Sequence, residues 1–243
     1  MVGPSFATRA DGLEFIDAGS HDEEQLQNSL AEMARVNRWL GGNRAIRRHL
    51  GECAKSVADE EPLRLLDVGT GRGDIPLFMA SELGSRADVK VYGLDLQRQV
   101  VRIAHHACRH SPRVEVLAGD ALALPFKTDA VDVVVSSLTL HHFDDDSAAA
   151  VVAEMARVAK RRVIITDLER HPVNYAGAQV LASTLWRRDP YSRYDGPLSV
   201  LRAFTREELA RIGRSAGLAN VQVFRHFPYR LALVGWTSMG RMS

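Results

Sequence analysis

Residues 65–76, LLDVGTGRGDIP, join an apolar run to a glycine-rich turn and then to a helix start. Gly69, Gly71 and Gly73 alternate with other residues, and Asp67 precedes the first of them by two positions. Glycines let the backbone turn sharply and approach a ligand closely, and a helix N-terminus offers free N–H groups. The dinucleotide fingerprint is G-x-G-x-x-G, and here the third glycine comes one residue early. A glycine turn can also serve packing alone, so the rest of the chain must decide its ligand.

Short apolar runs and helical stretches alternate on both sides of this turn. Strands that are apolar on both faces and alternate with helices indicate a parallel sheet covered on both sides. Two further runs around Pro228 indicate an adjacent, antiparallel pair. We expect an α/β fold: a doubly wound, mostly parallel seven-stranded sheet with a C-terminal antiparallel strand pair and N-terminal helices. The first five expected strands are 63–68, 89–95, 114–120, 130–137 and 162–167, and the clearest helix is 147–160.

The chain ends and one long connection lie outside this alternation. An S-x-x-E capping box at Ser20–Glu23 predicts the start of an N-terminal helix, and a second box at Thr205–Glu208 predicts a late one. We expect an N-terminal helical cap at 1–60 and a main domain at 61–243. Within the main domain, 168–204 has no evident place in the sheet and is expected to be a lid or substrate insertion.

Four of the expected strands end in an aspartate: Asp67, Asp95, Asp120 and Asp167. In open α/β sheets the ligand crevice lies at the carboxyl ends of the strands. Repeated carboxylates at this edge suggest a ligand rich in hydroxyl or amine groups.

The combination of D-x-G-x-G-x-G at 67–73, Asp95 ending the next strand, and Gly119, Asp120 and Ala121 after the third resembles the class I S-adenosylmethionine-dependent methyltransferases. The resemblance covers roughly 60–240 in element order. It implies S-adenosyl-L-methionine as cofactor and S-adenosyl-L-homocysteine as product. It also implies that Asp95 holds the ribose hydroxyls, that Asp120 and Ala121 contact the adenine, and that Asp67 sits near the ammonium group. The full set of implied cofactor contacts is Asp67, Gly69, Thr70, Gly71, Gly73, Asp95, Leu96, Asp120, Ala121 and Ser136.

Within that family, GDALALPFKTDAVDVVVSSLTLHHF (119–143) resembles the small-molecule branch, which includes ubiquinone/menaquinone-type and natural-product methyltransferases. The N-P-P-[YF]-type motif of enzymes that methylate amino groups of nucleic acids is absent, and SSLT occupies its place. We therefore expect O-methylation of a phenolic, polyketide-like or quinone-like acceptor. The alternatives are C-methylation of a quinol precursor, an RNA or protein methyltransferase, and a cofactor-binding protein without activity.

A phenolic or enolic acceptor must lose a proton. A histidine, whose pKa is about 6.5, can accept it. His141 and His142 follow the fourth expected strand, where the family presents the methyl group, and are the candidate catalytic bases. The alternative is that one of them is a hydrogen-bonded packing residue beside Phe143. The aspartates at 144–146 are explained by a helix start, so we expect no metal site there.

Asp167, Arg193 and Tyr194 are the candidate substrate-binding residues, because Asp167 lies at the crevice and the other two lie in the expected insertion. Lid residues paired with one another are the alternative. His106 and His110 share a helical face, but no third metal ligand accompanies them, so a solvated face is the simpler interpretation.

The length, charge and apolar runs of the chain limit the kinds of partner it is expected to have. The chain has 243 residues, a formal net charge of +1, and basic residues interspersed with acidic ones, which argues against a nucleic-acid partner. No apolar run approaches the roughly 20 residues of a membrane span, and the start lacks the apolar region of a signal peptide. We expect a cytoplasmic enzyme with a small-molecule substrate. The sequence leaves monomer and homodimer open.

Overall fold

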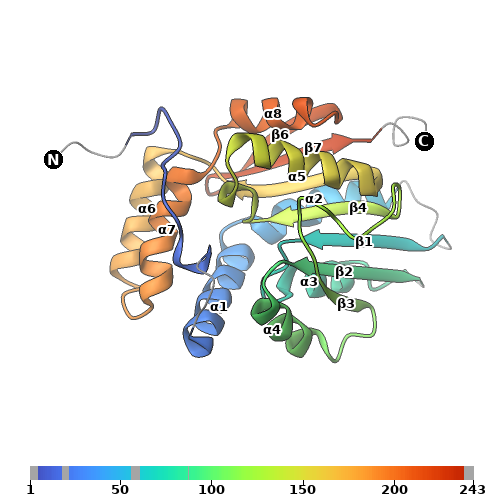
Figure 1. The fold of residues 1–243 in the computed structure, drawn as a ribbon, viewed down its shortest axis with the longest axis horizontal. Helices are drawn as coiled ribbons and strands as arrows, with labels where there is room; N and C mark the ends of the chain where they lie inside the picture. The colour runs from blue at the N-terminus through green and yellow to red at the C-terminus, as the bar shows by residue number, and fades with distance from the viewer. Residues whose placement is uncertain (1–4, 18–21, 56–60, 87, 238–243) are drawn as a thin grey trace.

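A computed structural model describes residues 5–17, 22–55, 61–86 and 88–237. Its seven-stranded sheet has the order β3-β2-β1-β4-β5-β7-β6, in which β7 runs antiparallel to both of its neighbours (Figure 1). The chain moves outward from β1 to β3 and then returns to place β4 on the other side of β1, so the strand order reverses between β1 and β4. Ligands of doubly wound sheets bind at such a reversal. The expected fold class is confirmed. The strands are β1 (Leu63–Val68), β2 (Val89–Asp95), β3 (Val114–Ala118), β4 (Val131–Ser137), β5 (Ala159–Leu168), β6 (Ala219–His226) and β7 (Arg230–Trp236).

Helices cover both faces of the sheet. Alternate residues of a strand point to opposite faces of the sheet. The side chains of the central strands therefore belong to two separate apolar clusters, one on each face. Val133 and Ile164 pack toward α2 and α3, whereas Val134 and Ile165 pack toward α5 and α8. The helices are α1 (Glu23–Trp39), α2 (Gly42–Ala54), α3 (Asp74–Glu82), α4 (Arg98–Cys108), α5 (Asp145–Val158), α6 (Pro172–Ser183), α7 (Pro190–Arg202) and α8 (Arg206–Ser215), with short 3-10 turns η1 (Phe15–Asp17) and η2 (Leu140–His142).

The helix starts follow the capping rules, with one correction. The capping box of Thr205 and Glu208 is confirmed at the start of α8. For α1, Ser20 lies outside the described residues, and the cap is Asp22, whose side chain accepts the backbone N–H of Gln25 at 2.9 Å. Asp144 caps α5 by accepting the N–H of Ser147 at 2.7 Å, as expected for the acidic run.

Residues 5–17, here named the N-terminal strap, run along α7 toward α1 (Figure 1). The carboxylate of Asp195 on α7 accepts the N–H groups of Phe15 and Ile16 at 2.7 and 3.2 Å. Residues 168–204 contain the end of β5 and then α6 and α7, which pack against each other. That this segment is a lid or substrate insertion stays a prediction. The division into a 1–60 cap and a 61–243 domain stays a prediction.

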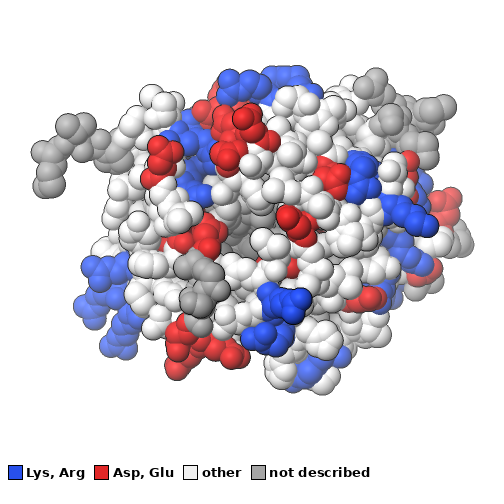
Figure 2. Space-filling model, viewed as in Figure 1, with Lys and Arg blue, Asp and Glu red and all other residues white. Residues whose placement is uncertain are grey.

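Charge is mixed on the face shown in Figure 2, where basic and acidic side chains alternate without a broad band of one sign. Within the described part of the chain, no helix combines the length and apolarity needed to cross a membrane.

Candidate active site

The loop after β1 forms the floor of a first cavity, here named the glycine-loop pocket. Gly69, Gly71 and Gly73 have φ values of +76°, +53° and +83°, so all three adopt the left-handed conformation that favours glycine. A Cβ on Gly69 would also collide with the side chain of Thr139. The backbone N–H of Gly71 donates to Oδ2 of Asp95 at 3.1 Å, which ties the loop to the end of β2.

The glycine-loop pocket has a volume of about 280 Å³ and lies at the carboxyl ends of β1, β2 and β4. None of the described residues that line it is Lys or Arg. Of the predicted cofactor contacts, those that line it are Gly69, Gly71, Asp95, Leu96, Asp120 and Ala121. Sequence reasoning missed Thr139, Gln97 and Asp17, which also line it.

Four predicted contacts lie behind or beside this lining: Asp67, Thr70, Gly73 and Ser136. Ser136 is buried and donates its hydroxyl to the carbonyl of Val68 at 2.9 Å, so it ties β4 to β1. Gly73 packs on Cys108, since a Cβ there would meet Sγ at 2.5 Å. Gly73 and Ser136 therefore shape the loop rather than face the cavity.

Asp67 is almost fully buried, with 1% of its surface exposed. Neither of its carboxylate oxygens has a hydrogen-bond partner among the described residues. Burial raises the pKa of Asp67 to about 8, and the nearby Thr70 hydroxyl only partly opposes this rise. A buried carboxylate without partners is suited to a cationic or hydrogen-donating ligand group.

The other two acids are placed differently. Oδ1 of Asp95 accepts the N–H of Gln97 at 3.1 Å, and burial raises the pKa of this carboxyl group. Asp120 is exposed in the turn after β3, and its Oδ1 accepts the N–H of Leu122 at 2.9 Å. This turn explains why β3 ends at Ala118 and not at Asp120 as expected. Carboxylates at this site, with no Lys or Arg among the described lining residues, suit a ligand that offers hydroxyl and amine groups.

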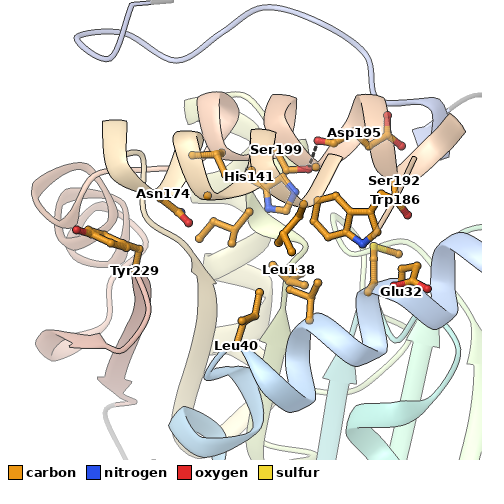
Figure 3. Close-up of a pocket in the computed structure, with 18 of the residues that line it drawn as sticks. Glu32, Leu40, Leu138, His141, Asn174, Trp186, Ser192, Asp195, Ser199 and Tyr229 are labelled. Atoms are coloured by element: carbon orange, nitrogen blue, oxygen red, sulfur yellow. Dashed lines mark hydrogen bonds between the residues drawn. The ribbon is translucent and has the colours of Figure 1, made fainter. Parts of the chain in front are cut away.

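A second cavity of about 490 Å³, here named the apolar pocket, lies between α1, α6 and α7 (Figure 3). Its apolar wall includes Leu40, Val173, Leu181 and Trp186, and Leu138 lies between His141 and α1. Its polar side chains are Glu14, Ser29, Glu32, His141, Asn174, Ser192, Asp195, Ser199 and Tyr229. A cavity of this composition suits a largely apolar molecule with a small polar head.

The predicted substrate residues Arg193 and Tyr194 do not line the apolar pocket. Both are exposed, and the Tyr194 ring packs on Phe15 at a centroid distance of 4.8 Å. Residues three and four apart share a helix face. Arg193 and Tyr194 therefore lie on the outer face of α7, away from the face that lines the pocket. That inner face carries Ser192, Asp195 and Ser199. Asp167 does not line the pocket either, but it contacts His141, which does.

Three residues line both cavities: Ile16 of the strap, Met33 of α1, and Leu138 after β4. Leu138 has a φ of +55°, which is uncommon for a residue other than glycine, and its N–H donates to Thr166 O at 3.0 Å. Such outliers cluster at functional sites. The two cavities therefore adjoin each other at these three apolar residues.

His141 is buried and is held by Asp167. Its Nδ1 lies 2.7 Å from Oδ1 of Asp167, and its backbone N–H donates to Oδ2 at 3.1 Å. Burial opposes ionisation of Asp167, but the charge and hydrogen bond of His141 outweigh burial and lower the pKa of the carboxyl group. An ionised carboxylate can only accept, so in the neutral form of His141 we assign the ring proton to Nδ1. The other nitrogen, Nε2, is then a proton acceptor on the side of the apolar pocket.

His142 has a different environment. Its Nδ1 lies 2.9 Å from Oδ1 of Asp17, and the residue lines the glycine-loop pocket. Burial alone would lower the pKa of His142, but the hydrogen bond and charge of Asp17 together with the charge of Glu14 raise it to about 9. A histidine that is protonated at neutral pH is a poor general base. The structure thus separates two residues that the sequence left equivalent.

Glu14, His141 and His142 are the one group of three potential metal ligands found among the described residues, with ligand atoms within 4.8 Å of one another. Arg202 supplies a fixed positive charge here, because its Nε lies 3.7 Å from Oε1 of Glu14. We therefore interpret the group as an acid–base cluster. The helical histidines His106 and His110 are exposed and lie outside it.

Comparisons with known proteins match this architecture. A family model described as a methyltransferase domain matches residues 65–162. A demethylmenaquinone methyltransferase of Roseiflexus sp. (strain RS-1) is 33% identical over 184 residues, which is 71% of this chain and 72% of the relative. A solved S-adenosylmethionine-dependent methyltransferase from Aquifex aeolicus has a TM-score of 0.60 at 20% identity, over 89% of this chain and 99% of the other. Human N-acetylserotonin methyltransferase in complex with S-adenosylmethionine has a TM-score of 0.63 at 16% identity, over 89% and 56%.

The fold is that of a class I methyltransferase, and the glycine-loop pocket lies at the carboxyl ends of β1, β2 and β4. The chain belongs to the class I S-adenosylmethionine-dependent methyltransferase family. It is an enzyme whose cofactor is S-adenosyl-L-methionine.

Proposed function

We propose that this enzyme methylates a ring carbon of a small, apolar, quinol-type acceptor and that His141 is the catalytic base. One observation carries the proposal: Asp167 holds Nδ1 of His141, while Nε2 lies 3.7 Å from Oε1 of Glu14, and His141 and Glu14 both line the apolar pocket. The name of the Roseiflexus relative favours carbon as the methyl acceptor. The O-methylation expected from the sequence has no such support and becomes the second candidate.

The glycine-loop pocket is the proposed cofactor site. Asp95 would bind the ribose hydroxyls, Asp120 and Ala121 the adenine, and Asp67 the ammonium group. The unpartnered oxygens of Asp67 support this role, because a cationic partner would offset the cost of burying that carboxylate. When bound, S-adenosyl-L-methionine supplies a methyl group on a positively charged sulfur.

The proposed work of the protein is to remove a proton and to exclude water. Nε2 of His141 accepts the proton of the acceptor hydroxyl, and Asp167 stabilises the imidazolium that forms. The negative charge left on the acceptor spreads from oxygen onto the adjacent ring carbons, which makes them nucleophilic. The carbon that gains the methyl group then loses its hydrogen as a proton, and the imidazolium of His141 returns a proton to the ring oxygen, so that the aromatic hydroxyl is restored and one proton is released overall. Ile16, Met33 and Leu138 surround the junction of the two cavities with apolar surface. Such general-base catalysis typically contributes about 10²–10⁴-fold in rate.

A product analysis tests the proposal. The enzyme is incubated with S-adenosyl-L-methionine carrying an isotopically labelled methyl group and with a panel of reduced quinols and phenols. Mass spectrometry detects methyl transfer, and NMR shows whether the label is bonded to carbon or oxygen. We expect a methyl group on a ring carbon adjacent to a hydroxyl. A methyl ether would instead establish the O-directed reaction, and no product from any member of the panel would contradict both.

A further inference from the structure

The N-terminal strap delivers one carboxylate to the apolar pocket. Glu14 is 3% exposed and lines this pocket. The strap is fixed on both sides of the site, because Asp195 accepts the N–H groups of Phe15 and Ile16, and Gln97 donates to the carbonyl of Ile16 at 2.7 Å. Glu14 is therefore placed by the fold and does not hang freely at the surface.

The two oxygens of Glu14 differ. Oε2 accepts the hydroxyl of Ser199 at 2.7 Å. Oε1 is buried and has no hydrogen-bond partner among the described residues. Leaving a buried acceptor without a hydrogen bond is energetically unfavourable. A native structure tolerates such a group where it has a functional partner.

Arg202 balances the charge of Glu14 without bonding to Oε1. Its Nε lies 3.7 Å from that oxygen, which is beyond the range of a hydrogen bond. Its N–H groups are instead donated to the carbonyls of Gly12 and His142, each at 2.6 Å. The accepting capacity of Oε1 is thus left for a molecule in the pocket.

A second acceptor lies beside Oε1. Nε2 of His141 is 3.7 Å from it, again too far for a direct hydrogen bond. Because Nδ1 carries the ring proton, both groups face the pocket as acceptors. One hydroxyl has one hydrogen and can satisfy only one of them. Two donors on adjacent ring atoms could make roughly parallel hydrogen bonds to both.

We propose that Glu14 is a specificity-determining residue that selects acceptors with two adjacent hydrogen-bond donors. One hydroxyl gives its proton to His141, and the neighbouring hydroxyl or N–H donates to Oε1 of Glu14. The apolar remainder of the molecule lies along α6 and Trp186. Among quinol-type acceptors the selected class is the apolar aromatic ortho-diol, together with its ortho-aminophenol analogue. This inference rests on the proposed role of the apolar pocket as the acceptor site.

Two probes that differ by one donor test the inference. Binding of naphthalene-1,2-diol and of 1-naphthol is measured by anaerobic calorimetry in the presence of S-adenosyl-L-homocysteine. A hydrogen bond to a charged group contributes about 1.5–3 kcal/mol, so the wild type should bind the diol about 10- to 100-fold more tightly. Glu14→Met, which keeps the length and removes the acceptor, should bind both probes about equally while its affinity for 1-naphthol is unchanged.

Glu24→Met is the matched control. Glu24 is exposed on α1 and lines neither cavity, so this variant should keep the preference for the diol. Equal binding of the two probes by the wild type, or a preference that survives in Glu14→Met, would overturn the role of Glu14 and leave the acceptor pocket standing. If the wild type binds neither probe while it binds S-adenosyl-L-homocysteine, the acceptor pocket itself is misassigned.

Discussion

The side chain of Asp167 holds both the backbone and the ring of His141: its Oδ2 accepts the backbone N–H at 3.1 Å, and its Oδ1 lies 2.7 Å from Nδ1. Parallel pairing sets Ser137, the last residue of β4, opposite Thr166 of β5. The chain that leaves β4 toward His141 therefore passes Asp167, the next residue of β5. The register of the sheet therefore fixes the orientation and tautomer of the proposed base.

Replacing Asp167 with asparagine should lower both activity and stability. Oδ1 also accepts the N–H of Leu168 at 2.7 Å, so both carboxylate oxygens accept N–H groups. In the asparagine variant the NH₂ group replaces one oxygen, and its hydrogens would then point at another N–H donor. We expect about 1–3 kcal/mol less stability and at least a tenfold lower kcat. Urea denaturation and steady-state kinetics measure the two effects. Asp146→Asn, at an exposed position in α5, is the control, and equal behaviour of the two variants would refute the role of Asp167.

Asp67→Asn should have opposite effects on the empty and the cofactor-bound protein. Burial raises the pKa of Asp67 to about 8, so its ionisation costs stability as the pH rises from about 4 to about 8. The amide cannot ionise, and the cofactor-free variant should be more stable than the wild type at pH 8. Its affinity for S-adenosyl-L-homocysteine should fall about 10- to 100-fold, because a charged hydrogen bond is lost.

Thermal unfolding with and without S-adenosyl-L-homocysteine measures both effects in one experiment. The stabilisation by this ligand should be larger for the wild type than for Asp67→Asn. A variant that is less stable without ligand but binds it with unchanged affinity would show that Asp67 serves the fold and not the cofactor.

The pair of His142 and Asp17 should make stability depend on pH. The pKa of His142 is raised to about 9, so its contribution is fully present below about pH 6.5 and is lost as the pH rises through about 9. The shift corresponds to about 3 kcal/mol. We expect the free energy of unfolding of the wild type, minus that of His142→Gln, to fall by about this amount between pH 6 and pH 10. A difference that stays constant over this range would contradict the assignment.

The conformation of the glycine-rich loop was predictable because its requirements are local. Three left-handed positions in a strand-to-helix turn require glycine, and Asp95 ends an apolar run that is visible in the sequence. The alternation of strands and helices likewise follows from short-range patterns. Thr139 was missed because only the folded loop shows its contact with Gly69.

The apolar pocket was not predictable in the same way. Glu14 reaches His141 across more than a hundred residues of sequence, through contacts of the strap with α7, and nothing near Glu14 signals this. On α7 the prediction chose Arg193 and Tyr194 for their chemistry, whereas the phase of the helix turns smaller polar residues inward. The difference between His141 and His142 also depends on carboxylates that are distant in sequence, Asp167 and Asp17.

The central claim is that His141 removes the proton of the acceptor, and two acceptors of different acidity test it most directly. Single-turnover rates are compared for wild type and His141→Ala with a quinol that is protonated at the assay pH and with a more acidic analogue that is already ionised. We predict a loss of about 10²–10⁴-fold for the protonated acceptor and little loss for the ionised one. An equal loss with both acceptors, or full activity of His141→Ala with the protonated one, would contradict the account.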